Sequence, residues 1–517
     1  MVTTQISAVV LTGAPLAIAD VVAVARGGAR VEVDPAAPRR MRPARDLVER
    51  LDASGEVAYG VTTGFGALAD VVVDPAHRAG LQRALIRSHS AGSGDPLPAE
   101  VVRGMLLLRA RTLCAGLSGV RPELVDAIAA LLNAGVVPLV PEHGSLGASG
   151  DLAPLAHAAA CLLGEGWAVG ADGDPVPAAD ALAAAGLAPV VVGVKEGLAL
   201  INGTDGMATL LALAVHDLEA ILVAADCAAA MSVEALLGTD RVFAEEIVRL
   251  RPSPGQAASG ANLRALLAES PIVADHRATR HAVQDAYSLR CTPQVHGAAR
   301  DAVGFARATV ERELATIVDN PLVFVDAGEI RSGGNFHGQA LAYAADLCAS
   351  VCADVAAIAE RRVDRLLDPA RSHGLPPFLT TEPGVNSGLM IAQYTAAALV
   401  AALRHAASPF AVQSASTSAG QEDHVSMGYE AALRTRRSVA QLRTVVAVEL
   451  VCASQALDLR TPLVPGPGTA AVRASVRERV DTLTADRIVA GDIAAVDALL
   501  RDGAWRSAAE ARVGPLV

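Results

Sequence analysis

Three long stretches without proline constrain the fold of this chain more than any other feature. No proline occurs within residues 190–251, 322–368 or 410–461. Proline interrupts helices because it lacks a backbone N–H and clashes with the preceding turn, whereas the alanine and leucine abundant in these stretches favour helix. The stretches are longer than ordinary globular helices, so the sequence predicts a bundle that runs the length of the molecule.

The clearest single helix is predicted over residues 340–368. Its apolar residues recur at spacings of three and four: Leu341, Ala344, Leu347, Val351 and Val355. That period is typical of a helix with one buried face. Residues 384–403 carry no charge, but polar side chains interrupt them. We therefore expect a buried helix there rather than a membrane span.

Breaks rich in glycine, proline and serine separate the helical stretches, and the first break covers residues 164–192. We expect a short strand or hairpin within it, because residues 190–192 are its only strongly β-branched run. The sequence thus predicts a mainly α protein. Residues 1–200 form a mixed N-terminal lobe, and residues 201–517 form a central helical bundle with C-terminal helices.

Composition narrows the class of protein further. Charged residues make up 19% of the 517 residues, below the roughly 25% typical of soluble proteins, which suggests surface hidden between subunits. The net charge of −12 argues against a nucleic-acid-binding surface. The first basic residue is Arg26, so a signal peptide is not expected. The seven cysteines are scattered, which predicts free thiols in a cytoplasmic protein and no zinc site.

Residues 144–155 contain a sequence that can build an electrophile from backbone atoms. The nitrogen of Gly150 can attack the carbonyl of Ala148, and Ser149 then loses its hydroxyl as water. The product is a five-membered ring with an exocyclic methylidene. Closure needs a kinked backbone, which glycine permits. A bare Ala-Ser-Gly is also typical of a turn that caps a helix, so the tripeptide alone does not decide.

Two further segments carry candidate reactive side chains. Residues 59–66 begin with Tyr59 and are rich in glycine, but they lack Gly-Lys-Ser/Thr and follow no clear strand, which argues against nucleotide binding. Gln284, Tyr287 and Arg290 stand three residues apart, a spacing that aims them towards one side of a helix. Without other motifs, that pattern is equally typical of a polar interface helix.

In this order, these segments resemble the histidine and aromatic amino acid ammonia-lyases. Other segments that carry the resemblance are residues 87–92, 196–204, 319–322, 333–338 and 421–428. The resemblance implies a histidase/fumarase-like, mainly α fold and a homotetramer whose active sites are each assembled from several subunits. It also implies that Ala148, Ser149 and Gly150 form a 4-methylidene-imidazol-5-one (MIO) ring, without metal or nucleotide.

The resemblance also assigns expected roles. Two groups follow from it: candidate bases Tyr59 and Tyr287, and candidate substrate-binding residues His89, Asn202, Gln284, Arg290, Phe336 and Glu422. A phenol has an unperturbed pKa near 10, so a base of this kind needs a positive or hydrogen-bond-donating site. A guanidinium can bind a substrate carboxylate in bidentate fashion.

The substrate depends mainly on Glu422. A carboxylate can accept a hydrogen bond from an imidazole N–H, and residues 421–428 resemble actinobacterial-type histidine ammonia-lyases, which implies formation of urocanate and ammonia. Residues 336–339 and 88–92, however, resemble the tyrosine lyases and 2,3-aminomutases, and Asp205 stands where many histidine lyases have glutamine. Elimination of ammonia from an amino acid is therefore expected, and the choice between histidine and tyrosine stays open.

Overall fold

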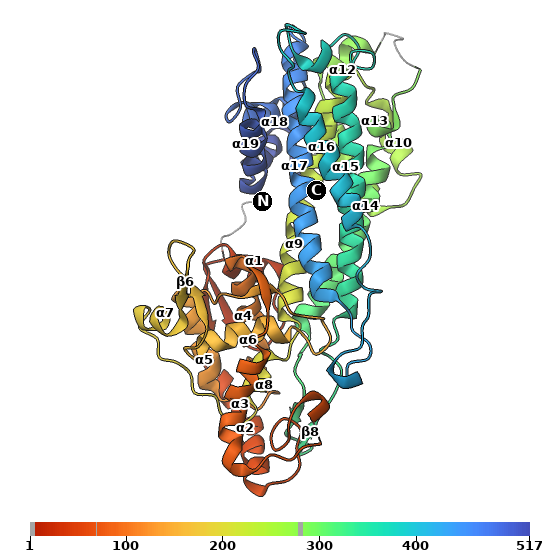
Figure 1. Ribbon diagram of the computed structural model, residues 1–517. Helices are drawn as coiled ribbons and strands as arrows, with labels where there is room; N and C mark the ends of the chain where they lie inside the picture. Colours follow the sequence, from red (N-terminus) through yellow and green to blue (C-terminus); the bar gives the residue numbers. More distant parts are fainter. Residues whose placement is uncertain (1–5, 69, 278–282) are drawn as a thin grey trace.

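The computed structural model describes residues 6–68, 70–277 and 283–517. The chain forms a lobe of short helices and small β ladders, joined to a long helical bundle (Figure 1). The lobe contains α1 (Ile18–Ala25), α2 (Ala37–Ser54), α3 (Pro75–His89), α4 (Ala99–Cys114), α5 (Pro122–Asn133), α6 (Leu152–Leu162), α7 (Ala178–Ala184) and α8 (Glu196–Ile201). Helix α3 begins at Pro75 because the side chain of Asp74, its N-cap residue, accepts a hydrogen bond from the Ala76 N–H at 2.9 Å.

The described strands form four two-stranded ladders. They are β1 (Ala8–Leu11) with β2 (Arg30–Val33), β3 (Ser93–Pro96) with β4 (Pro141–His143), β5 (Trp167–Val169) with β6 (Pro175–Pro177), and β7 (Leu322–Phe324) with β8 (Glu329–Arg331). The first ladder is parallel, with Ala8 opposite Arg30, and the other three are antiparallel. None extends into a larger sheet in the described chain, so the prediction of a mainly α fold is confirmed.

Five helices make up the bundle. They are α9 (Asp205–Ala235), α14 (Thr292–Ala315), α15 (Gln339–Leu367), α16 (Met390–Ala406) and α17 (Gly428–Leu459). The longest, α9, α15 and α17, have 31, 29 and 32 residues, which corresponds to roughly 45 Å each at 1.5 Å per residue. The proline-free stretches therefore form the long helices that the sequence predicts.

Shorter elements surround the upper part of the bundle (Figure 1). The helices are α10 (Glu245–Val248), α11 (Pro254–Leu267), α12 (Pro271–His276), α13 (Tyr287–Arg290), α18 (Pro467–Arg477), α19 (Val489–Asp502) and α20 (Ala504–Val513). Two single 3₁₀ turns, η2 (Arg241–Phe243) and η3 (Pro377–Leu379), also lie here, whereas η1 (Gly66–Leu68) and η4 (Ser418–Gly420) contact each other at the lobe end. One continuous apolar core runs from the lobe into the bundle. All seven cysteines are free thiols, as predicted.

The hairpin expected in the first break exists, but it does not use the β-branched run. Its strands are β5 and β6, and Gly173, at φ 86°, lies in the turn between them. Residues 190–192 are not in a strand. The Val190 N–H instead donates to the Leu162 carbonyl at the end of α6, at 2.8 Å. Turn geometry therefore decided the location of this hairpin.

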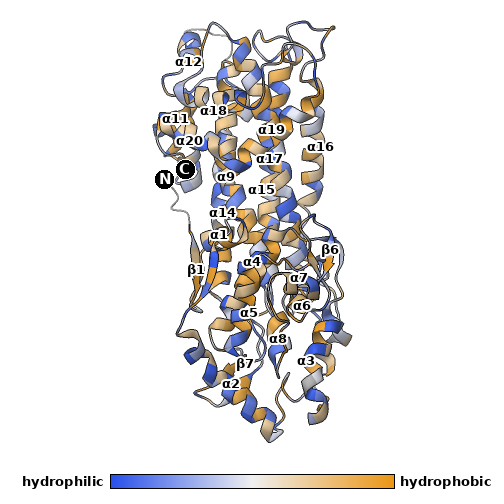
Figure 2. Cartoon of the chain, turned by 90° about the vertical axis from the view of Figure 1, so that its left-hand side faces the viewer, coloured by the Kyte–Doolittle hydropathy of each residue, from blue (hydrophilic) through white to orange (hydrophobic). Residues whose placement is uncertain are grey.

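The helix expected over residues 384–403 begins only at Met390. The preceding residues form a turn, because Asp486 accepts hydrogen bonds from the N–H groups of Ser387 and Gly388 at 2.8 and 2.9 Å. The expectation of a buried helix is wrong for the single chain, since Ile391 and Tyr394 are 59% and 62% exposed. Figure 2 shows α16, rich in apolar residues, at the edge of the bundle.

Two helical stretches of the described chain are long and apolar enough to cross a membrane: residues 196–235 and α15. In the apolar windows of these stretches, 78% and 61% of the residues are buried inside the protein. They are therefore core helices of the bundle.

After α14 the chain leaves the bundle and returns to the lobe (Figure 1). Val323 of β7 packs against Ala44 and Val48 of α2, and its N–H donates to the Leu117 carbonyl at 2.8 Å. The loop before α15 is thereby brought back towards the segment that carries Ser149. The predicted domain boundary near residue 200 stays a prediction.

Candidate active site

The loop that carries Ala148, Ser149 and Gly150 has the kinked backbone that ring closure needs. Gly150 has φ 77°, and a Cβ atom there would lie 2.3 Å from the Gly203 carbonyl oxygen. The same oxygen accepts a hydrogen bond from the Asp151 N–H at 2.7 Å. Only glycine fits both this conformation and this close approach.

Distant segments hold the loop from outside. The Gly147 carbonyl accepts hydrogen bonds from the Ser426 hydroxyl at 2.7 Å and from the Gly338 N–H at 3.0 Å. The Met427 N–H donates to the Leu146 carbonyl at 2.8 Å. The turn before α17 and the loop before α15 therefore fix the backbone just ahead of Ala148.

Asp151 anchors the other end of the loop. One of its carboxylate oxygens accepts from the Ser145 hydroxyl at 2.8 Å, and the other accepts from the Met207 N–H at 2.9 Å. Burial of the side chain raises the pKa of Asp151 to about 7. This carboxyl joins the two ends of the loop to the first turn of α9.

Glu422 lies directly beside the reactive serine. The Ser149 hydroxyl donates to Glu422 Oε1 at 3.2 Å, and the Thr417 hydroxyl donates to Oε2 at 2.9 Å. The backbones of Thr417 and Glu422 also pair, with N–H to carbonyl distances of 2.9 and 3.3 Å. The carboxylate is thus held in place by side-chain and main-chain contacts at once.

His89 ends α3 close enough to Glu422 for its charge to act on the imidazole. Burial lowers the pKa of His89, although a hydrogen bond to the Leu85 carbonyl and the charge of Glu422 oppose that shift. The imidazole is therefore neutral at pH 7. A neutral ring beside a carboxylate can take part in hydrogen bonding without neutralising it.

Tyr59 is half-buried, and its hydroxyl oxygen accepts a hydrogen bond from the Gly66 N–H at 3.1 Å. The glycines of residues 59–66 serve close packing here. A Cβ on Gly60 would lie 2.6 Å from the Leu198 side chain.

Asn202 follows α8 and is 3% exposed. Its amide nitrogen donates to the Asn320 carbonyl at 3.2 Å, while its Oδ1 is buried without a hydrogen-bond partner among the described residues. Arg109 fixes the backbone, because its Nη1 donates to the Asn202 carbonyl at 2.7 Å. The next residue, Gly203, packs against Gly150, so a free acceptor lies one residue from the loop.

Phe336 lies half-buried in the loop before α15. Two residues later, Gly338 donates its N–H to the Gly147 carbonyl. The structure therefore brings Glu422 to Ser149 and His89 near Glu422. Asn202 and Phe336 lie on segments that contact the loop of Ser149. Tyr59 lies on a loop that approaches Ser418, next to Thr417.

Gln284, Tyr287 and Arg290 lie elsewhere in the single chain. Tyr287 is 70% exposed, and the Arg290 guanidinium stacks 4.5 Å from the centroid of its ring. The neighbouring Asp285 accepts a hydrogen bond from the Thr239 N–H, just beyond the C-terminal end of α9. The loop of Ser149 contacts the N-terminal end of the same helix, roughly 45 Å away by helical rise. One chain therefore does not bring these three predicted residues to Ser149.

Sequence patterns missed several residues that shape the site. Arg109, Thr417 and Ser426 each fix a predicted residue or the loop itself. Ser426 lies within the recognised segment 421–428, which is the one signal that could have found it. Thr417 and Arg109 act across the fold and have no local pattern.

Comparison with known proteins decides the family. Residues 16–478 match the sequence model of a family described as aromatic amino acid lyase. The chain belongs to the aromatic amino acid lyase family. The resemblance predicted from the sequence is therefore confirmed.

Relatives of this aromatic amino acid lyase match it over nearly their whole length. The histidine ammonia-lyase of Streptomyces avermitilis is 52% identical over 498 residues, which cover 96% of this chain and 97% of the relative. That of Gloeobacter violaceus is 50% identical over 507 residues and 98% of each chain.

Solved structures of the family share the fold. Histidine ammonia-lyase from Trypanosoma cruzi has a TM-score of 0.90 at 39% identity, covering 98% of this chain and 95% of that one. Tyrosine aminomutase from Streptomyces globisporus has a TM-score of 0.93 at 37% identity, covering 99% and 100%.

Proposed function

We propose that this aromatic amino acid lyase is a histidine ammonia-lyase, which eliminates ammonia from L-histidine to give urocanate. The observation that carries the proposal is the contact between the Glu422 carboxylate and the Ser149 hydroxyl. It puts an acceptor suited to an imidazole N–H at the reactive residue. The relatives named histidine ammonia-lyase, at 50–52% identity, support the same substrate.

Ala148, Ser149 and Gly150 fit the MIO ring that the family implies. The kinked backbone and the contact of Gly150 with Gly203 favour cyclisation, and the buried Oδ1 of Asn202 can accept a hydrogen bond beside it. The ring supplies an electrophile that captures the substrate covalently and eases the departure of ammonia.

Loss of the Ser149 hydroxyl has a consequence for Glu422. In the uncyclised chain that hydroxyl donates a hydrogen bond to Oε1 of Glu422, and the Thr417 hydroxyl donates one to Oε2. When the hydroxyl leaves as water, Oε1 loses its donor and becomes free for an imidazole N–H. The contact with Thr417 keeps the carboxylate in place meanwhile.

Other residues act on the proton and on orientation. Tyr59 is the proposed base for the β-proton of the substrate, and the hydrogen bond from the Gly66 N–H positions its hydroxyl. The Asn202 amide orients the reacting groups. Neutral His89 and Phe336 line the side-chain end of the pocket.

The proposed site needs more than one copy of the chain. We propose a homotetramer in which Gln284, Tyr287 and Arg290 of one copy complete the site around Ser149 of another. Two observations support this: the exposure of Tyr287 and the apolar exposed face of α16. We also propose that the protein is cytoplasmic and that residues 1–200 form its N-terminal lobe.

A second candidate is a tyrosine ammonia-lyase or a tyrosine 2,3-aminomutase with the same MIO chemistry. The similarity of residues 336–339 to that group, and the TM-score of 0.93 with a tyrosine aminomutase, favour it. Histidine is preferred because the relatives named histidine ammonia-lyase are 50–52% identical to this chain, whereas the tyrosine aminomutase is 37% identical.

Product analysis tests the proposal. The purified protein is incubated with histidine and, separately, with tyrosine, and urocanate, coumarate and β-tyrosine are quantified. We expect urocanate from histidine, and an intact mass that lacks two waters. The Ser149→Ala variant is the control and should show neither. Coumarate or β-tyrosine as the main product would establish the second candidate, and a fully active Ser149→Ala protein would exclude MIO chemistry.

A further inference from the structure

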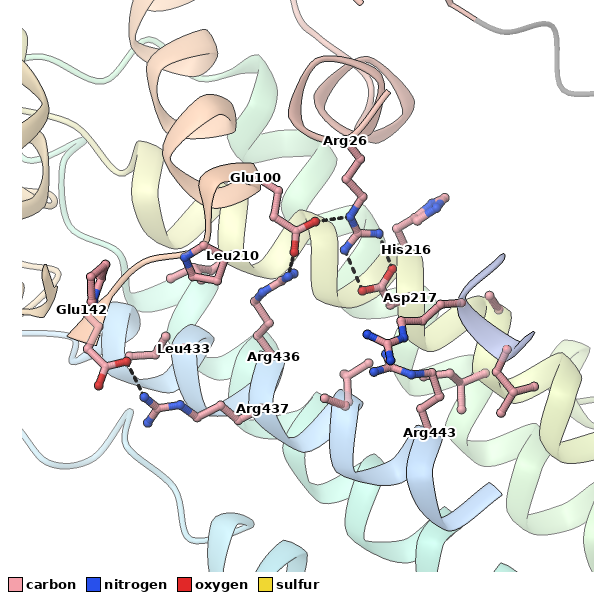
Figure 3. Close-up of a pocket in the computed structure, with 18 residues that line it drawn as sticks. Arg26, Glu100, Glu142, Leu210, His216, Asp217, Leu433, Arg436, Arg437 and Arg443 are labelled. Carbon is pink, nitrogen blue, oxygen red and sulfur yellow. Dashed lines mark hydrogen bonds and ion pairs between the residues drawn. The ribbon is translucent and has the colours of Figure 1, made fainter. Parts of the chain in front are cut away.

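A cavity of about 670 Å³ lies between the lobe and the bundle, apart from the residues around Ser149. Its walls come from the end of α1, the start of α4, β4, α9, α17 and α19 (Figure 3). Its size falls within the range of sites for small molecules, roughly 300–1,000 Å³. None of its lining residues has a role in the proposed elimination.

The lining is rich in arginine. Five arginines, Arg26, Arg436, Arg437, Arg443 and Arg501, face three carboxylates, so the lining carries an excess of two positive charges. Arg443 and Arg501 also share one carboxylate outside the lining, that of Asp497. Even with Asp497 counted, arginines outnumber acids here, although the whole chain has a net charge of −12.

The carboxylates do not satisfy all of these guanidinium groups. Glu100 is shared by Arg26 and Arg436, and Asp217 pairs with Arg26 (Figure 3). Arg436 Nη1 is buried without a hydrogen-bond partner in the described parts of the chain. Burial and the charges of Arg26 and Arg443 lower the pKa of Arg436 to about 10. A buried donor without a partner is costly, and an anion with several oxygens would satisfy it.

We propose that this cavity binds a phosphate group, with the Arg436 guanidinium as its anchor. A phosphate monoester carries a charge of about −1.5 to −2 at pH 7, opposite in sign to the local excess of positive charge. Its oxygens can pair with the planar guanidinium in bidentate fashion. The volume exceeds that of a free phosphate ion, and Leu210, Ile221 and Leu433 offer apolar wall for the organic part of a phosphate ester.

Occupancy of the cavity acts on the loop of Ser149 through Arg437. This arginine pairs with Glu142 of β4, and His143 pairs with Glu430 of α17 at 2.8 Å. The loop begins at the next residue, Gly144. A bound phosphate competes with Glu142 for Arg437 and weakens the contact of β4 with α17. This effect, which rests on the proposed function, lowers kcat/KM for histidine.

The binding test does not depend on turnover. Inorganic phosphate and adenosine monophosphate are titrated calorimetrically into the intact protein in phosphate-free buffer. We expect saturable binding, one site per chain, and binding at least roughly tenfold weaker in Arg436→Gln. Arg361→Gln is the matched control, since that side chain is 59% exposed on α15 and outside the cavity lining, and it should bind as the wild type does.

The two probes distinguish the sources of the phosphate group. Tighter binding of adenosine monophosphate supports an ester as the occupant, and binding of inorganic phosphate alone supports the free ion. If Arg436→Gln does not fold, Arg437→Gln, whose side chain is 56% exposed, replaces it and should bind both probes several-fold more weakly.

Three results would overturn the inference. They are no saturable binding of either probe, unchanged affinity in the Arg436→Gln or Arg437→Gln protein, and equal weakening in Arg361→Gln. Binding with unchanged kcat/KM would overturn the effect on the loop. Failure of histidine turnover would instead count against the proposed function, because the calorimetric titration measures binding alone.

Discussion

Replacing Thr417 by valine tests whether Glu422 must be held in place for the reaction. The substitution keeps the shape of the side chain but removes the hydroxyl that donates to Glu422 Oε2 at 2.9 Å. The backbone pairing between the two residues involves no side-chain atoms and stays intact. Only the position of the carboxylate is therefore perturbed.

The expected size follows from the contact. A hydrogen bond to a charged group contributes about 1.5–3 kcal/mol, and both residues are half-buried, so the lower end applies. A loss of about 1.4 kcal/mol corresponds to a tenfold change. We expect kcat/KM for histidine to fall roughly tenfold in Thr417→Val, measured from urocanate formation, with ring formation unchanged in the intact mass.

Thr417→Ser is the matched control, because it keeps the hydroxyl and should retain most of kcat/KM. Wild-type kcat/KM in Thr417→Val would refute the role of this contact. Equal loss in the serine and valine variants would refute it too, since the methyl group rather than the hydroxyl would then matter.

Three other predictions follow from single contacts. In Gly150→Ala the new Cβ would lie 2.3 Å from the Gly203 oxygen, so the ring should not form and the intact mass should show no loss of water. The control Gly304→Ala has open space around the new Cβ, so it should form the ring and lose two waters. Tyr59→Phe should lower kcat by roughly 100-fold or more with the ring still formed, and an unchanged kcat would eliminate Tyr59 as the base. Burial raises the pKa of Glu234 to about 7, above its unfolded value of about 4.3. The folded state therefore holds a proton that the unfolded state has lost, and wild-type stability should fall as pH rises between those values. Thermal denaturation from pH 5 to 8 should show a shallower slope in Glu234→Gln than in the wild type, because the raised pKa of Asp151 contributes to the slope of both proteins; identical slopes would contradict the prediction.

The parts of the fold that depend on local composition were predictable. Missing prolines and abundant alanine are properties of a stretch by itself, so α9, α15 and α17 followed from the sequence. The location of the first hairpin did not, because the turn at Gly173 rather than the β-branched run decides it. The partial exposure of α16 was equally hidden, since burial depends on what packs against a helix.

The candidate site divides in the same way. Residues 144–155 are contiguous, so their chemistry was visible in the sequence. Thr417 and Ser426 reach the site from far along the chain, and no pattern announces such contacts. The order of the motifs predicted that Tyr287 and Ser149 act in the same site. That order does not give the distance between them within one chain, where the length of α9 separates the two.

The length of α9 has a consequence for how activity depends on concentration. Each chain carries one part of the proposed site at either end of a rod of roughly 45 Å. A folded single chain would then be catalytically silent, and the number of working sites would follow the assembled fraction. Dissociation would abolish turnover without unfolding any subunit, so subunit affinity would set the lowest protein concentration at which the enzyme works.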